Sequence, residues 1–127
     1  MHPITVLVAD DEAMVRTAVS DMLGAHPLIV VVGLASDAAG AVALARTHHP
    51  SVALLDVRMP GGGGVEAARG IRLASPQTHI LAHSAFDDAR SLTTMLAAGA
   101  EGLIVKGTDG PEILERVLAA GQAARAS

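Results

Sequence analysis

Five short runs of apolar residues recur along the chain, and within each run the apolar residues do not alternate with polar ones. Continuous runs of this length are typical of strands that are covered on both faces, as in a parallel sheet. We therefore predict five buried strands, at residues 4–9, 28–35, 52–55, 79–82 and 103–105.

Segments with the apolar spacing of helices separate these runs and follow the last one. A strand followed by a helix, five times over, predicts an α/β fold of the (βα)5 type. Its sheet is parallel, its crossovers are right-handed and its helices cover both faces. With 127 residues, we expect one domain spanning residues 1–127. The helical stripes are Met14, Val15, Ala18, Val19, Met22 and Leu23; Ala38, Val42 and Ala45; Val65, Ala68 and Ile71; Leu92, Met95, Leu96 and Gly99; and Ile113, Leu114, Val117 and Leu118.

Residues that favour helix ends agree with this division. Ser36 is placed to cap the second helix. Asp109, with Glu112 three residues later, resembles a capping box for the last helix, and Pro111 lies in its first turn. Gly24 and Gly99 stand where the first and fourth helices are expected to end.

The composition excludes several classes of protein. The net charge of −4 argues against general electrostatic binding of nucleic acid, and the single aromatic residue, Phe86, leaves no platform for stacked bases. The lack of cysteine excludes disulfides and thiol chemistry, and no apolar run approaches the length of a membrane span. The N-terminus lacks the pattern of a secretory signal, so we expect a cytoplasmic protein.

Polar residues follow the predicted strands at the edge where α/β sheets bind ligands. Asp10, Asp11 and Glu12 follow the first strand, and Asp56, Ser84 and Lys106 follow the third, fourth and fifth. A single Asp at such a position is usually a cap or turn residue, but this combination on one edge is more specific. Three clustered carboxylates require a compensating cation, and Mg²⁺ suits oxygen ligands. Asp56 could then act as a nucleophile that forms an acyl phosphate, with Ser84 and Lys106 stabilising the phosphoryl oxygens.

Five segments stand in a characteristic order and separation: Val8-Ala9-Asp10-Asp11-Glu12, Leu55-Asp56-Val57-Arg58-Met59-Pro60, Ser84-Ala85, Ala98-Gly99-Ala100 and Val105-Lys106. On these segments the chain resembles the receiver domain of bacterial two-component response regulators over essentially its whole length. The resemblance implies a flavodoxin-like fold with strand order 2-1-3-4-5. It also implies that Asp56 is the phosphoacceptor and that Ser84 and Lys106 contact the phosphoryl group. Mg²⁺ or Mn²⁺ would be bound by Asp11 and Asp56, by Asp10 through a water, and by the backbone carbonyl of Arg58.

Such a domain implies a histidine kinase or phosphotransfer protein as the phosphoryl donor and an output domain or partner under its control. It would catalyse only its own phosphorylation and dephosphorylation, and would not be a turnover enzyme. A homodimer could form through the face made by the fourth helix, fifth strand and fifth helix. We expect no direct binding to nucleic acid and none to membranes. Residues 100–107 resemble receivers that are joined to helix-turn-helix effectors, so the chain could be part of a longer protein.

The sequence departs from the family pattern at several places. The usual aromatic switch residue is replaced by Leu103, the usual Lys-Pro by Lys106-Gly107, and a segment that commonly includes an acid by Gly61–Gly64. These changes leave the acceptor site complete but predict altered coupling to the far face. By the resemblance, Arg58 and Phe86 occupy the two positions that border the water needed for hydrolysis. Neither side chain can accept a proton from that water, so we predict a long-lived phosphorylated form.

Other interpretations of the same residues are weaker. A pseudo-receiver that only binds partners usually lacks the acceptor, an acid or the lysine, and all of these are present here. A haloacid-dehalogenase-type phosphatase would need a second Asp where Arg58 stands. The Gly62–Ala67 segment fits a dinucleotide fingerprint only formally, because it follows the third strand. The scattered histidines predict no metal site, with His79 and His83 expected in or near the core, and Met14 and Met22 are expected in the core.

Overall fold

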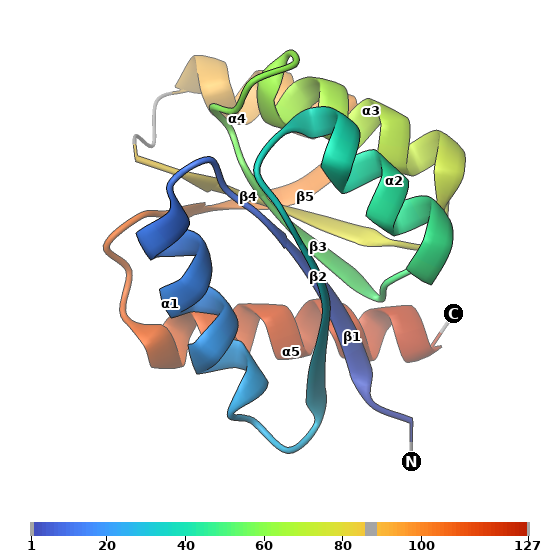
Figure 1. Cartoon of the computed structure of the whole chain (residues 1–127), viewed down its shortest axis with the longest axis vertical. Helices are drawn as coiled ribbons and strands as arrows, with labels where there is room; N and C mark the ends of the chain where they lie inside the picture. Colours follow the sequence, from blue (N-terminus) through green and yellow to red (C-terminus); the bar gives the residue numbers. More distant parts are fainter. Residues whose placement is uncertain (1, 86–88, 127) are drawn as a thin grey trace.

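The computed structural model describes residues 2–85 and 89–126 and shows the expected alternation of strands and helices (Figure 1). All strand pairs are parallel, and the sheet has the order β2-β1-β3-β4-β5. This confirms the flavodoxin-like (βα)5 fold. In chain order the elements are β1 (Ile4–Ala9), α1 (Ala13–Gly24), β2 (Ile29–Ala35), α2 (Ala38–His48), β3 (Val52–Asp56), α3 (Gly63–Ala74), β4 (His79–Ser84), α4 (Ala89–Ala98), β5 (Ala100–Val105) and α5 (Gly110–Ala126).

The helices cover both faces of the sheet and enclose two apolar cores. On one face α2, α3 and α4 pack on the sheet, largely through alanines such as Ala41, Ala45 and Ala68. Small side chains allow close approach, and a Cβ on Gly70 of α3 would overlap Val42 of α2. On the other face, α1 and α5 pack on larger residues such as Ile4. The alanine-rich composition therefore serves one of the two helical layers.

Three of the strands, β3, β4 and β5, extend further than the apolar runs alone predict, whereas β1 matches its run and β2 begins one residue later. β3 ends at Asp56 and β4 at Ser84, because these polar residues are buried and still pair with neighbouring strands. β5 begins at Ala100, three residues before the predicted start. Glu101 interrupts the apolar pattern there, but β5 is an edge strand, so this side chain can remain exposed.

The helix caps confirm part of the prediction and correct the rest. Asp109 Oδ1 accepts a hydrogen bond from Glu112 N at 2.9 Å, as expected, and Gly99 follows α4 with a φ of 119°. The prediction for Ser36 is wrong: Asp37 caps α2, because its Oδ1 accepts a hydrogen bond from Gly40 N at 2.7 Å. Gly24 is the last residue of α1, where the helix was expected to end, although the residue after it is right-handed and so forms no left-handed cap.

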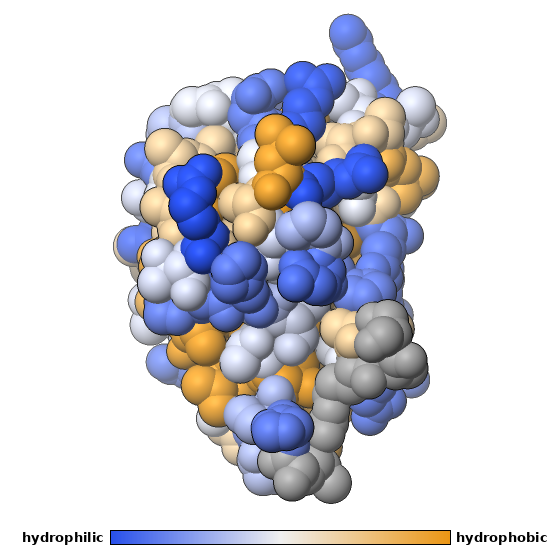
Figure 2. Space-filling view, turned by 90° about the vertical axis from the view of Figure 1, so that its right-hand side faces the viewer, coloured by the Kyte–Doolittle hydropathy of each residue, from blue (hydrophilic) through white to orange (hydrophobic). Residues whose placement is uncertain are grey.

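The prediction that Met14 lies in the core is also wrong, since its exposed fraction is 86%. Residues 11–14 are all exposed, because this turn carries the chain from the end of β1 into the first turn of α1. Met22, two turns further on, packs against the core as expected. Figure 2 shows one face of the molecule, where apolar side chains form separate patches between hydrophilic ones. Within residues 2–85 and 89–126, no helix is long and apolar enough to cross a membrane.

Candidate functional site

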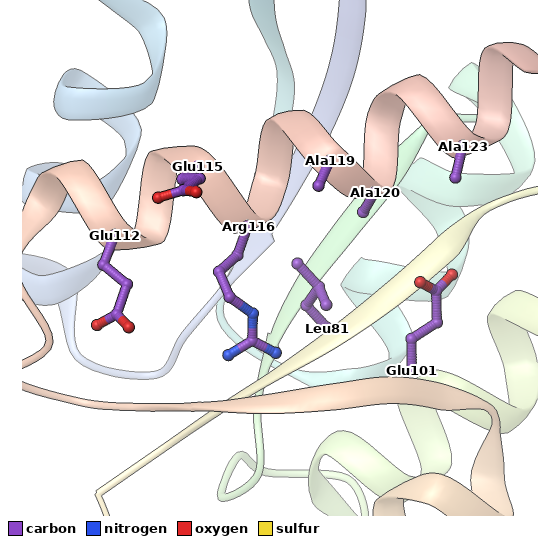
Figure 3. A pocket seen from close by; sticks show the side chains of 8 residues that line it. All are labelled: Leu81, Glu101, Glu112, Glu115, Arg116, Ala119, Ala120 and Ala123. Atoms are coloured by element: carbon purple, nitrogen blue, oxygen red, sulfur yellow. The ribbon is translucent and has the colours of Figure 1, made fainter.

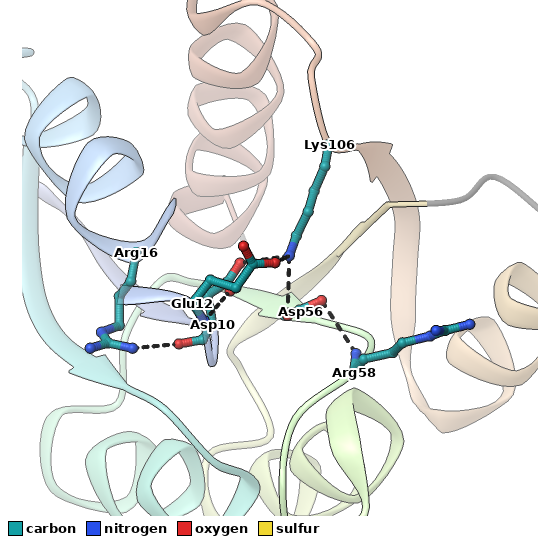
Figure 4. A network of polar contacts seen from close by, with 6 residues as sticks. All are labelled: Asp10, Glu12, Arg16, Asp56, Arg58 and Lys106. Atoms are coloured by element: carbon teal, nitrogen blue, oxygen red, sulfur yellow. Dashed lines mark hydrogen bonds and ion pairs between the residues drawn. The ribbon is translucent and has the colours of Figure 1, made fainter. Parts of the chain in front are cut away.

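The carboxyl ends of β1, β3, β4 and β5 bring the predicted polar residues to one small pocket. The pocket has a volume of about 240 Å³. Residues that are far apart in the chain meet here because parallel strands all end at the same edge of the sheet. Asp10 adjoins the pocket and forms an ion pair with Lys106, which is one of the lining residues (Figure 4). The pocket is lined by Asp11, Glu12, Asp56, Arg58, Ser84, Ala85 and Lys106.

Three carboxylates form a cluster at the floor and rim of this pocket. Asp10, Asp11 and Asp56 each offer one oxygen, and these oxygens all lie within 4.8 Å of one another. Asp10 and Asp56 are buried, whereas Asp11 is exposed. Carboxylate oxygens in this arrangement are the ligands that Mg²⁺ prefers, and an exposed ligand leaves room for the waters that this ion retains. The residues present therefore fit a hard divalent cation.

Lys106 contacts both of the buried carboxylates. Its Nζ lies 3.2 Å from Asp56 Oδ2, 3.1 Å from Asp10 Oδ2 and 3.6 Å from Glu12 Oε1. Burial lowers the pKa of Lys106, but its contacts with Asp10 and Asp56 outweigh burial and raise the pKa above its ordinary value. Lys106 is therefore a cation in this site. One ammonium faces two buried carboxylates, so the buried charges do not balance.

Asp56 bears the effect of this imbalance. The pKa of Asp56 is raised in total from 3.8 to about 6, and burial is the largest of the causes. The hydrogen bond from Arg58 N lowers the pKa, the negative charge of Asp10 raises it, and the contact with Lys106 lowers it again. With a pKa of about 6, Asp56 is mostly ionised at neutral pH and can act as a nucleophile.

Backbone contacts fix the end of β3. Arg58 N lies 3.3 Å from Asp56 Oδ1 and donates a hydrogen bond to it. Val57 N donates to His83 O, which ties the residue after Asp56 to β4. The first turn of α3 packs directly on this strand end, because a Cβ on Gly64 would lie 2.6 Å from Asp56 O. The carboxylate of Asp56 is thus held at a defined place.

The remaining predicted residues lie at or near the pocket. Ser84 is buried at the end of β4, and its carbonyl accepts a hydrogen bond from Lys106 N at 2.6 Å. Leu103 is partly buried against the core beneath α2, α3 and α4. Arg58 is exposed at the pocket rim. Phe86 lies outside the described residues.

Two residues near the site were missed at the level of sequence. Arg16 of α1 donates a hydrogen bond from Nη1 to the backbone carbonyl of Asp10 at 2.7 Å. His83 is buried one residue before Ser84, and within the described part of the chain its Nε2 has no hydrogen-bond partner. Burial, followed by the positive charge of Lys106, lowers the pKa of His83, while the charge of Asp10 opposes this. His83 was expected only as a core residue, and no spacing pattern in the sequence links Arg16 to Asp10.

A larger groove lies away from this chemistry, between β5 and α5 (Figure 3). It has a volume of about 440 Å³ and contains none of the residues predicted for the site. Arg116 crosses it and donates a hydrogen bond from Nη1 to Leu103 O at 3.1 Å. It is lined by Leu81, Glu101, Glu112, Glu115, Arg116, Ala119, Ala120 and Ala123.

Comparison with known proteins identifies the family. The transcriptional activator DevR/DosR of Mycobacterium tuberculosis is 35% identical over 90% of this chain and 52% of its own length. The response regulator GacA of Pseudomonas viridiflava is 37% identical over 94% of this chain and 56% of its own. This chain therefore spans about half the length of these curated relatives.

Solved structures agree with the sequence relatives. The signal receiver domain of NarL from M. tuberculosis matches with a TM-score of 0.90 and 36% identity, covering 96% of this chain and 98% of that one. The response regulator domain of CheB from Thermotoga maritima matches with a TM-score of 0.87 and 31% identity, over 95% and 98%. Residues 6–118 match the response regulator receiver domain. The chain belongs to the family of response regulator receiver domains.

Proposed function

We propose that this receiver domain accepts a phosphoryl group on Asp56 in a reaction that requires Mg²⁺ or Mn²⁺. Receiver domains of response regulators interact with histidine kinases, so we infer that the donor is a phosphorylated histidine of a kinase or phosphotransfer protein. The observation that carries the proposal is the position of Asp56. Its carboxylate borders an open pocket, 3.2 Å from Lys106 Nζ and within 4.8 Å of two other acids.

The proposed transfer forms one bond and breaks one. An oxygen of ionised Asp56 attacks the phosphorus, and an acyl phosphate P–O bond forms. The P–N bond of the donor breaks, its electron pair remains on the imidazole nitrogen, and that nitrogen takes a proton from solvent. Such a transfer depends mainly on in-line positioning and on stabilising charge on the equatorial oxygens.

The residues around Asp56 divide this work. Asp11 and Asp56 would hold the cation directly, Asp10 would hold it through a water, and the Arg58 carbonyl would complete the protein ligands. When bound, the cation offsets the repulsion of the carboxylates and neutralises charge on the phosphoryl oxygens. Lys106, which already contacts Asp56, would turn its ammonium toward the phosphoryl group. We assign Ser84, one strand away, to a hydrogen bond with the same group.

Phosphorylation would change how the domain acts on the output domain or partner that it controls. The name of DevR/DosR calls that relative a DNA-binding transcriptional activator. We propose that this domain likewise controls an output domain or partner, with a homodimer through the α4, β5 and α5 face as one route. Leu103 replaces the usual aromatic switch residue, so no ring can turn inward on phosphorylation. We therefore expect the phosphorylated and unphosphorylated states to differ little on the α4, β5 and α5 face. Arg58 and Phe86, which cannot act as a base, would slow loss of the phosphoryl group.

Treatment with acetyl phosphate and Mg²⁺, followed by intact mass, tests the proposal. The wild type should gain the mass of one phosphoryl group, and EDTA should prevent the gain. Asp56→Asn should not be labelled, whereas the matched control Asp21→Asn, on the exposed side of α1, should be labelled like the wild type. Labelling of Asp56→Asn would refute the assignment. A wild type that takes up no phosphoryl group would instead support a pseudo-receiver that acts only by binding partners.

A further inference from the structure

Hydrogen bonds hold both the backbone and the side chain of Asp10 in place. Its N–H donates to Ala35 O at 3.0 Å, which joins the end of β1 to β2. Its Oδ1 accepts a hydrogen bond from Glu12 N at 2.9 Å, and its carbonyl accepts one from Arg16 Nη1 at 2.7 Å. In Figure 4 the Arg16 guanidinium approaches Asp10 from the side away from Lys106 and Asp56. Arg16 therefore acts on the backbone of the acidic turn and does not enter the pocket.

The side chain of Asp11 is held differently from that of Asp10. Among the residues that the structure describes, its carboxylate forms no hydrogen bond or ion pair, yet one of its oxygens belongs to the cluster with Asp10 and Asp56. The direction of this exposed side chain is set by the backbone that carries it. The peptide before Asp11 contains the carbonyl of Asp10, which is the group held by Arg16.

We propose that Arg16 is a positioning residue for the metal site, because it fixes the Asp10–Asp11 peptide so that Asp11 faces Asp56. This inference rests on the proposed function, since it assumes a divalent cation at the carboxylate cluster. Arg16 touches neither the cation nor the phosphoryl group. A guanidinium bound to a carbonyl restrains the peptide plane, and α1 anchors the guanidinium at the other end. Residues that orient metal ligands in this way typically alter metal affinity by about 10–100-fold.

Isothermal titration with Mg²⁺ measures the effect directly. Relative to the wild type, Arg16→Ala should bind Mg²⁺ about tenfold more weakly. Arg16→Lys retains one donor and should lie between the two. The matched control Arg46→Ala removes an exposed arginine at the end of α2 and should bind like the wild type. An affinity of Arg16→Ala within twofold of the wild type overturns the inference. If Arg16→Ala does not fold, Arg16→Lys and Arg16→Gln decide by the same criterion.

A double-mutant cycle separates positioning from a general loss of structure. If Arg16 acts through Asp11, Arg16→Ala should change the affinity less than twofold when Asp11→Asn is already present. An equal loss in both backgrounds overturns the inference. The metal-free amide signals of Asp11 and Glu12 in Arg16→Ala should also shift, and unchanged signals count against it.

The outcomes distinguish this inference from the function on which it rests. If the wild type binds no Mg²⁺ and takes up no phosphoryl group from acetyl phosphate, both fall. If the wild type does both and Arg16→Ala binds Mg²⁺ normally, the proposed function stands and only the role of Arg16 is wrong.

Discussion

The role proposed for Asp56 places an ionisable carboxyl group where it lowers the stability of the fold. Its side chain is almost wholly buried, it lies near a second buried acid, and one ammonium serves both. An apolar or amide side chain at this position would avoid the desolvation of a charge. The raised pKa of Asp56 is therefore a destabilising contribution at neutral pH, because ionisation is easier in the unfolded chain.

The Asp56→Asn variant should be more stable than the wild type at pH 7.5 when EDTA is present. Because the folded pKa of about 6 exceeds the ordinary 3.8, the favourable contribution of Asp56 is complete below 3.8. It is lost as the pH rises through 6. The difference corresponds to about 1–3 kcal/mol of unfolding free energy at pH 7.5. Urea denaturation at several pH values measures it.

The same comparison provides its own check, because the advantage of Asp56→Asn should shrink toward zero near pH 4. The control Asp21→Asn, exposed on α1, should follow the wild type at every pH. An Asn variant that is less stable than the wild type at pH 7.5 would show that contacts of the ionised carboxylate outweigh its desolvation.

His83 should act in the opposite direction on acidification. Its pKa is lowered from 6.5, mainly by burial, so its contribution to stability is complete above 6.5 and is lost as the pH falls below it. His83→Leu removes the titrating group, so between pH 6.5 and 5 its stability should fall less steeply than that of the wild type. The difference in slope is at most about 1.4 kcal/mol per pH unit. His48→Gln, at the exposed end of α2, is the control, and equal slopes for wild type and His83→Leu would contradict the prediction.

At the scale of elements, strands were easier to predict than their ends. The run at residues 4–9 is β1 as predicted, because a central strand covered on both faces needs continuous apolar residues. The run at 103–105 is only the second half of β5, because an edge strand tolerates Glu101 and Gly102. Asp56 and Ser84 extend their strands although they are polar, and both belong to the candidate site. The deviations thus lie at an edge strand and at the end of the sheet that carries the candidate site.

The cap of α2 is a case where two neighbouring residues were both suitable in sequence. Ser36 and Asp37 are each good cap residues, and only the backbone decides between them. Asp37→Ala should lower the unfolding free energy by about 1 kcal/mol, because Gly40 N loses its acceptor. Ser36→Ala should change it by less than about 0.5 kcal/mol. Thermal denaturation of the two variants checks this, and a larger effect of Ser36→Ala would reverse the assignment.

At the scale of the whole molecule, the shared edge of the sheet made most of the candidate site predictable from the sequence. Contacts that depend on how neighbouring elements pack could not be predicted. Asp10, Asp56, Ser84 and Lys106 could be grouped in advance because each follows a strand and all such ends share one edge. The contact between Arg16 and the Asp10 carbonyl depends on how α1 leaves β1, which no spacing rule predicts. Within the described part of the chain the Nε2 atom of His83 has no hydrogen-bond partner, and this too depends on packing between neighbouring strands that the sequence does not show.

Mg²⁺ should stabilise the whole domain against unfolding, because it would relieve the repulsion between carboxylates that are fixed to the ends of β1 and β3 at the centre of the sheet. A ligand that binds only the folded state stabilises it by about 2.7 kcal/mol at 100 times its dissociation constant. For a domain of this size that corresponds to a rise in Tm of roughly 5–10 °C.

The Tm of the Asp10→Asn, Asp11→Asn double variant should differ from that of the wild type both without and with Mg²⁺. Without Mg²⁺ it should melt at a higher temperature than the wild type, because the repulsion at Asp56 is relieved. With Mg²⁺ its Tm should not rise, because the cation has lost two of its three carboxylates. NaCl at equal ionic strength controls for screening and should leave both proteins nearly unchanged. Differential scanning calorimetry with and without Mg²⁺ gives all four values. An equal rise in Tm for both proteins would mean that Mg²⁺ stabilises the domain at some place other than this carboxylate cluster.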